Sequence, residues 1–329
     1  MFKNKLIRFL FFITLCILFT GCSVKQPATE SKPPETTTQP PESEDTDDFD
    51  LEDSYLHGGS FGDSIEISNE YVKLDYFIAL SRKEIDCTVL AFQNGAAVPF
   101  SFEPDGDYSL SHRKTFPTRE QNGSIYIKAA ALHQGDSVSF GMGFVCNSDF
   151  MPEIQESPHY GREQMINHYA KAYTASRDFS SDTVINILTD VDWEAYPDIL
   201  PSRLAASINE HDDLEALKDL MHGKLINNFK VMDASGKDSI HIYYLLEQNP
   251  EVSFPAGAVS FYLDHLPLKI NGQYDAVYIT PPEKGFLLAG FDLSLPEDLE
   301  SGPHTFYSRL VSDNPDITYH YTDQRILLY

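Results

Sequence analysis

The chain has 329 residues with 24 basic and 50 acidic side chains, which gives a formal net charge of −26 at pH 7. Nucleic acids and anionic lipid head groups are bound through basic surfaces. This balance therefore argues against nucleic acid as a partner, and it is typical of a protein kept soluble and monomeric by charge repulsion.

Residues 1–21 have the pattern of a secretory signal peptide. Three basic residues, Lys3, Lys5 and Arg8, come first. An uncharged apolar run over residues 9–19 and then small residues follow, as in a cleavable signal. The run is shorter than the roughly 20 residues that span a bilayer, so we expect cleavage rather than a retained membrane helix.

The end of this segment, Leu18-Phe19-Thr20-Gly21-Cys22, resembles the lipobox of bacterial lipoproteins, although Phe19 stands where that family most often has leucine. The resemblance implies lipid attachment to the Cys22 thiol and cleavage between Gly21 and Cys22. It also implies a protein held on the extracytoplasmic face of the cell membrane, as in Gram-positive bacteria, with the membrane as a partner through the lipid. Two acyl chains anchor a protein stably, since each buried methylene contributes about 0.8 kcal/mol. A plain secretory signal is the alternative.

Residues 22–55 are rich in Pro, Thr, Ser and Glu. Such a composition cannot bury enough apolar surface to offset chain entropy. We expect a disordered acidic tether that reaches up to roughly 100 Å if it is extended in the polyproline form.

Short apolar runs between turn residues dominate residues 56–157 and predict a first antiparallel β-sandwich. The runs are residues 71–78, 87–92, 124–127 and 137–140.

Residues 227–329 repeat this arrangement. The runs at 259–263, 291–295 and 305–307 follow the order and spacing of those in the first half. The fold class predicted is therefore mainly β, with two tandem Ig-like antiparallel β-sandwich domains. The tyrosine-rich end, residues 319–329, is expected to be a final strand, or alternatively a tyrosine binding face.

Residues 158–226 have helical rather than strand-like spacing of apolar residues, which predicts a small helical connector between the two domains. Leu214, Leu217 and Leu220 share one helical face within residues 212–221. Met165, Tyr169 and Tyr173 also have helical spacing.

Two of the four cysteines, Cys87 and Cys146, lie in the folded part within strand-like surroundings. Outside the cytoplasm they could form a disulfide. Its loop of about 60 residues would contribute roughly 4 kcal/mol in the chain-entropy model. The alternative is two separate buried thiols.

Trp193, the only tryptophan, lies among acidic residues that include Asp190 and Asp192. An aromatic ring beside carboxylates suits contact with a sugar ligand, and a carboxylate pair is what a glycosidase needs. A solvated loop around a partly buried tryptophan explains the same residues.

No catalytic residue, cofactor site or metal site is predicted. Gly58-Gly59-Ser60-Phe61-Gly62 fits the G-x-S-x-G pattern of serine hydrolases, but an acidic tether precedes it instead of the buried strand that this turn needs. A Gly/Ser-rich hinge between tether and domain is the better interpretation. Zinc-binding spacings and glycine-rich phosphate loops do not occur in the sequence.

The sequence thus predicts a non-catalytic binding or accessory module for a protein or glycan ligand at the cell surface. A solute-binding receptor of a transporter is one alternative, and it would need two α/β lobes around a cleft. A cell-wall or glycan hydrolase is another.

Overall fold

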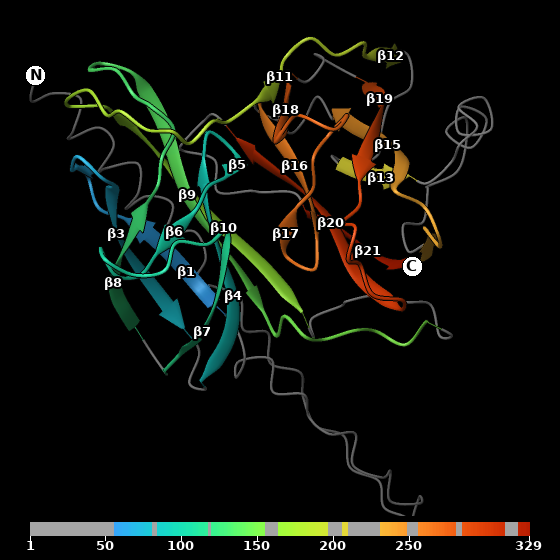
Figure 1. The fold of residues 1–329 in the computed structure, drawn as a ribbon, viewed down its shortest axis with the longest axis horizontal. Helices are drawn as coiled ribbons and strands as arrows, with labels where there is room; N and C mark the ends of the chain where they lie inside the picture. The colour runs from blue at the N-terminus through green and yellow to red at the C-terminus, as the bar shows by residue number, and fades with distance from the viewer. Residues whose placement is uncertain are drawn as a thin grey trace, which may run out of the picture. The chain divides into compact units, whose positions relative to one another are not determined.

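The computed structural model describes nine stretches of the chain, all within one compact unit, Asp50–Tyr329. These are residues 56–80, 84–117, 120–154, 164–196, 206–209, 231–248, 256–280, 285–312 and 322–329. The described residues form strands and no α-helix, so the prediction of a mainly β fold is confirmed (Figure 1). No helix able to cross a membrane occurs in these stretches.

The first half of the described chain forms two antiparallel sheets, which we call the first sheet pair. Its outer sheet has the order β1-β3-β8-β6, with β2 beside β3, and its inner sheet has the order β10-β9-β4-β5, with β7 beside β4. Leu74 and Ile125 of the outer sheet share one hydrophobic core with Val89 and Phe144 of the inner sheet. The strands are β1 (Leu56–Phe61), β2 (Glu66–Ile67), β3 (Val72–Leu80), β4 (Ile85–Gln93), β5 (Ala96–Ala97), β6 (Phe100–Ser101), β7 (Ser111–Phe116), β8 (Glu120–Ile127), β9 (Ser137–Cys146) and β10 (Met165–Thr174).

The second sheet pair is built in a similar way. Its inner sheet has the order β11-β18-β16-β20-β21-β14, with β17 beside β16, and its outer sheet has the order β12-β19-β15-β13. Ile242 and Phe291 of the outer sheet share a core with Phe261 and Leu310 of the inner sheet. The strands are β11 (Ile187–Leu188), β12 (Glu194–Tyr196), β13 (Ala206–Asn209), β14 (Val231–Asp233), β15 (Ser239–Gln248), β16 (Gly257–Leu263), β17 (Leu266–Pro267), β18 (Ala276–Ile279), β19 (Gly285–Ser294), β20 (Pro303–Ser312) and β21 (Thr322–Leu328).

The two sheet pairs agree in strand order and in register. In each inner sheet a central strand (β4 or β16) pairs with a long strand (β9 or β20), which in turn pairs with β10 or β21. The registers correspond residue by residue: Cys87–Cys146 and Val89–Phe144 in the first pair, Gly257–Ser312 and Val259–Leu310 in the second. Equivalent left-handed turns follow the central strands, at Asn94-Gly95 and Asp264-His265.

The helix expected at Met165, Tyr169 and Tyr173 is wrong, because these residues lie on β10. This strand pairs with β9 along its whole length, and Tyr169 and Tyr173 both contact the first core. Residues four apart share a face in a strand as well as in a helix, since four is a multiple of the strand period of two. Residues 164–196 contain no helix. The expected helix at 212–221 lies outside the described residues, as do Cys22, the signal segment and the tether.

The expected hinge at residues 58–62 is also wrong, because most of it belongs to β1, which pairs with β3. Gly59 lies under the Tyr169 ring, where a Cβ atom would stand 2.7 Å from Cδ2. The glycine therefore permits close packing of the outer sheet on a ring from the inner sheet.

The two inner sheets pack on each other. Leu90, Phe92 and Val145 of the first pair form one buried cluster with Tyr262 and Tyr307 of the second. The Phe92 and Tyr262 rings meet edge to face at 6.4 Å, and the Tyr262 and Tyr307 rings stack at 5.0 Å. Both central strands are consequently buried on both faces.

A cation lies inside this contact. The Arg309 side chain on β20 is fully buried, with its guanidinium carbon 4.0 Å from the centre of the Phe92 ring. None of its three nitrogens has a hydrogen-bond partner among the described residues, and burial lowers the pKa of the group well below its usual range. Its equivalent in β9 is Gly143, and the guanidinium occupies the space that a side chain there would fill.

We expect Arg309→Met to stabilise the protein by about 1 to 4 kcal/mol, because it keeps the packing and removes a desolvated charge that lacks an acceptor. Urea denaturation measures the change. Phe92→Ala, which opens a cavity in the same contact, should cost about 3 to 5 kcal/mol. A less stable Arg309→Met variant would show that the cation has a favourable partner.

Candidate functional site

The acidic segment around Trp193 borders a cavity of about 460 Å³ on the outer sheet of the second pair. Its walls come from three places in the chain: the segment before and into β12, the strand β15 and the strand β19. The lining residues are Asp192, Trp193, Glu194, Tyr243, Leu288, Ala289 and Gly290.

Trp193 is half-buried and fixed by packing. Its ring meets Phe291 edge to face at 6.1 Å and lies against the second hydrophobic core. Pairing of β12 with β19 begins at the next residue, Glu194, which stands opposite Leu288. The tryptophan is therefore held on a sheet and not on a free loop.

The carboxylates of this segment differ in position. Asp192 and Glu194 are exposed and line the cavity on either side of Trp193 in sequence. Asp190 is exposed as well but does not line the cavity. Of the three ligand-contact residues expected from the sequence, the structure thus brings two to one cavity.

Tyr243 on β15 also lines this cavity, and sequence reasoning missed it. Its neighbours on β15, Ile242 and Tyr244, point into the core, so Tyr243 lies on the other face of the sheet. The signal was present as alternation along residues 239–244, but nothing in the sequence pairs β15 with β19.

Gly290 gives the cavity its floor beside Tyr243. A Cβ atom there would lie 2.8 Å from His241 Nε2 and 3.3 Å from Tyr243 Cε1. His241 is held by a 2.8 Å hydrogen bond between its Nδ1 and Asp292 Oδ1. The absence of a side chain at residue 290 therefore keeps the aromatic wall accessible.

This arrangement combines two amphipathic rings with carboxylate acceptors. Such rings offer an apolar surface that is already ordered, and the acceptors can orient hydroxyl or amine groups of a ligand. No cluster of three or more His, Cys, Asp or Glu side chains able to hold a metal ion occurs in the described stretches.

No family model matches the chain, and no curated protein matches it either.

Cys87 and Cys146 lie directly opposite each other on β4 and β9. They are free, buried thiols with their sulfur atoms 3.1 Å apart, close enough for one to donate a hydrogen bond to the other. This hydrogen bond and burial raise the pKa of Cys87, which disfavours the thiolate that nucleophilic catalysis needs.

We expect this pair to oxidise to a disulfide in an oxidising compartment, because facing cysteines on neighbouring strands satisfy the distance requirement. Mass spectrometry after non-reducing proteolysis should find the two peptides linked. The bond should add about 4 kcal/mol to the unfolding free energy in the chain-entropy model. Cys87→Gly/Cys146→Ser, which copies the equivalent Gly257–Ser312 pair, is the matched control. Two free thiols after oxidative export would contradict the prediction.

Proposed function

We propose that this protein is a lipid-anchored, extracytoplasmic binding module that acts without catalysis and recognises a glycan at the cell surface. In this proposal the lipid on Cys22 anchors a disordered tether, which carries two tandem Ig-like β-sandwiches. The common strand order and register of the two sheet pairs support the tandem arrangement. The lipobox-like sequence before Cys22 supports the anchor.

The observation that carries the binding role is the cavity that Trp193 and Tyr243 both line. Both rings are half-buried; Tyr243 lies on β15, and Trp193 directly precedes β12 and packs on Phe291. Little side-chain entropy therefore remains to be lost when a ligand binds. Sugar rings have apolar C–H faces edged by hydroxyl groups. They fit a site whose walls are aromatic and whose rim carries the carboxylates of Asp192 and Glu194.

The two alternative functions, a solute-binding receptor and a glycan hydrolase, would need different structural features. A solute-binding receptor of the usual kind is built from two α/β lobes, whereas the described residues form strands without helices. A glycan hydrolase would use Asp192 and Glu194 as its carboxylate pair. Release of reducing sugar ends during the binding experiment would favour the hydrolase.

Binding at this cavity should change the fluorescence of Trp193, which is unambiguous because the chain has one tryptophan. We expect a saturable change with soluble peptidoglycan fragments or N-acetylglucosamine oligomers. Tyr243→Ala should weaken this binding at least about tenfold, since it removes one aromatic wall.

Tyr126→Ala is the matched control for that titration. Tyr126 is also a half-buried tyrosine, on β8 of the outer sheet of the first pair. An unchanged affinity in Tyr243→Ala, or an equal loss in Tyr126→Ala, would argue against the cavity as the binding site.

The anchor is tested separately. We expect Cys22→Ala to abolish incorporation of labelled palmitate and to release the protein from the membrane fraction, because the thiol is the attachment point implied by the lipobox. Labelling that persists in this variant would refute the anchor. The same variant should keep the Trp193 titration unchanged.

A further inference from the structure

A second cavity, of about 370 Å³, lies where the two sheet pairs meet. We call it the inter-pair cleft. Ser111, Arg113 and Asp149 line it from the first pair, and Asp264 and His265 line it from the second. We propose that the inter-pair cleft binds a neutral polyhydroxylated ligand, a sugar or polyol, that touches both sheet pairs at once. This site is separate from the Trp193 cavity and does not depend on the function proposed for it.

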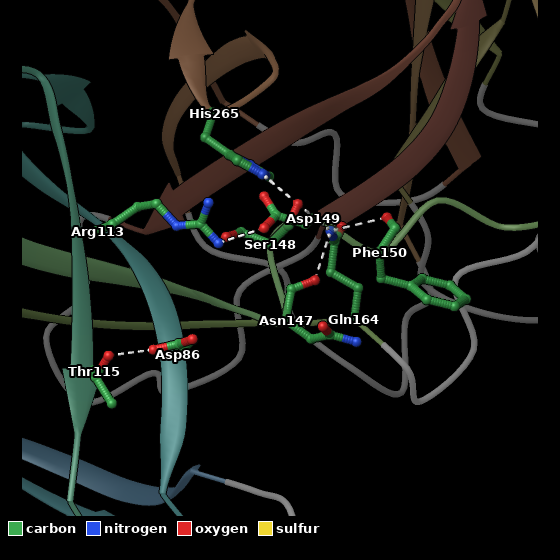
Figure 2. A network of polar contacts seen from close by, with 9 residues as sticks. All are labelled: Asp86, Arg113, Thr115, Asn147, Ser148, Asp149, Phe150, Gln164 and His265. Carbon is green, nitrogen blue, oxygen red and sulfur yellow. Dashed lines mark hydrogen bonds and ion pairs between the residues drawn. The ribbon is translucent and has the colours of Figure 1, made fainter.

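The floor of the cleft is a turn that follows β9 and is fixed by a buried amide (Figure 2). Gln164, which is 1% exposed, directs its Nε2 group to the carbonyl oxygens of Asn147, Ser148 and Phe150 at 3.3, 3.1 and 3.4 Å. Its Oε1 accepts a 2.8 Å hydrogen bond from Gln324 on β21 of the second pair. The turn is therefore held in place from both sheet pairs before any ligand arrives.

His265 fixes the same turn from the other side. It has a φ of 70° at the position equivalent to Gly95, a conformation that non-glycine residues rarely adopt. Its Nε2 lies 3.0 Å from the carbonyl oxygen of Ser148, and its Nδ1 lies 3.4 Å from the Tyr307 hydroxyl. Burial lowers the pKa of His265, so the ring is neutral, donates through Nε2 and accepts at Nδ1. An ordered but strained residue of this kind is typical of binding sites.

The charges along the cleft are already paired within each wall. Arg113 Nη2 donates to Asp149 Oδ2 at 2.5 Å, and Asp264 Oδ2 lies 2.6 Å from His304 Nδ1. Asp264 Oδ1 also accepts the backbone N–H of Thr305 at 3.0 Å. Because each charge already has a partner, a charged ligand gains little net electrostatic attraction from these side chains. A neutral ligand can use the remaining N–H groups of the guanidinium and the remaining lone pairs of the carboxylates.

Hydroxyl groups complete the lining. Ser148 Oγ is buried and has no hydrogen-bond partner among the described residues, which is costly for a buried polar atom. Thr88 and Ser111 line the same cavity. A ligand hydroxyl can donate to one such group and accept from another, whereas an apolar ligand would leave Ser148 Oγ unpaired.

The test is a titration of the full-length chain with N-acetylglucosamine, N-acetylglucosamine oligomers and glycine, followed by ¹⁵N-resolved NMR. Tyr243→Ala is used as the background, so that the Trp193 indole N–H reports any residual binding at the other cavity. We expect saturable shifts at the backbone amides of Ser111 and Ser148 with the sugar or its oligomers and none with glycine. A response to the oligomers alone would identify a glycan chain as the source.

Ser148→Ala removes the unpaired hydroxyl and keeps the backbone carbonyl that His265 contacts. It should weaken binding at least about fivefold, whereas Ser137→Ala, at the exposed start of β9, should leave the affinity unchanged. Thr88→Val, which keeps the side-chain shape, provides a second test if Ser148→Ala does not fold. Shifts confined to Trp193, unaltered affinity in both cleft variants, or binding of glycine in the cleft would each overturn the proposal.

Discussion

Contact between the two inner sheets is the constraint on which the other features depend, because it leaves β4 and β16 without a solvent face. A strand buried on both sides is mostly apolar, and its partners must fit on both faces. Phe92 and Tyr262 meet in this contact from equivalent positions of the two sheet pairs. The inter-pair cleft exists because this contact brings the two pairs together, and the hydrogen bond from His265 to the Ser148 carbonyl oxygen joins them there.

Local sequence patterns predict eight of the 21 described strands, among them β3, β4, β9 and β16, and miss the long strands β10 and β15. The run at residues 87–92 is apolar except for Thr88 and becomes part of β4, and Asn94-Gly95 forms the left-handed turn that its composition indicates. The patterns fail at Tyr169 and Tyr173, because a spacing of four residues fits both a helix and a strand. They also fail at Gly59, because its packing against the Tyr169 ring is not visible in the local sequence. For Tyr169 and Tyr173 the deciding contact is the pairing of β10 with β9. For Gly59 it is the contact with Tyr169, about a hundred positions away in the sequence.

The candidate sites also contain residues that the local sequence indicates and residues that only the fold brings together. Trp193 and Asp192 are adjacent in sequence, so the sequence alone indicates a candidate ligand site of an aromatic ring among carboxylates. Tyr243 and Gly290 become part of that cavity only through the pairing of β15 with β19. The inter-pair cleft could not be predicted from local sequence patterns. His265 and Ser148 lie on different sheet pairs, and no local pattern indicates their hydrogen bond.

Gly143 and Arg309 occupy equivalent positions in the two sheet pairs. This difference affects which sheet pairs can associate with each other. Two similar sheet pairs on one chain could in principle associate in three combinations, first with first, second with second, or first with second. Pairing two second pairs would oppose two buried guanidinium groups, and pairing two first pairs would oppose two glycines and leave the contact underfilled. Only the mixed combination places one large side chain against one empty position. The residue that weakens the contact energetically is thus the one that directs it to form between unlike sheet pairs and not between like ones.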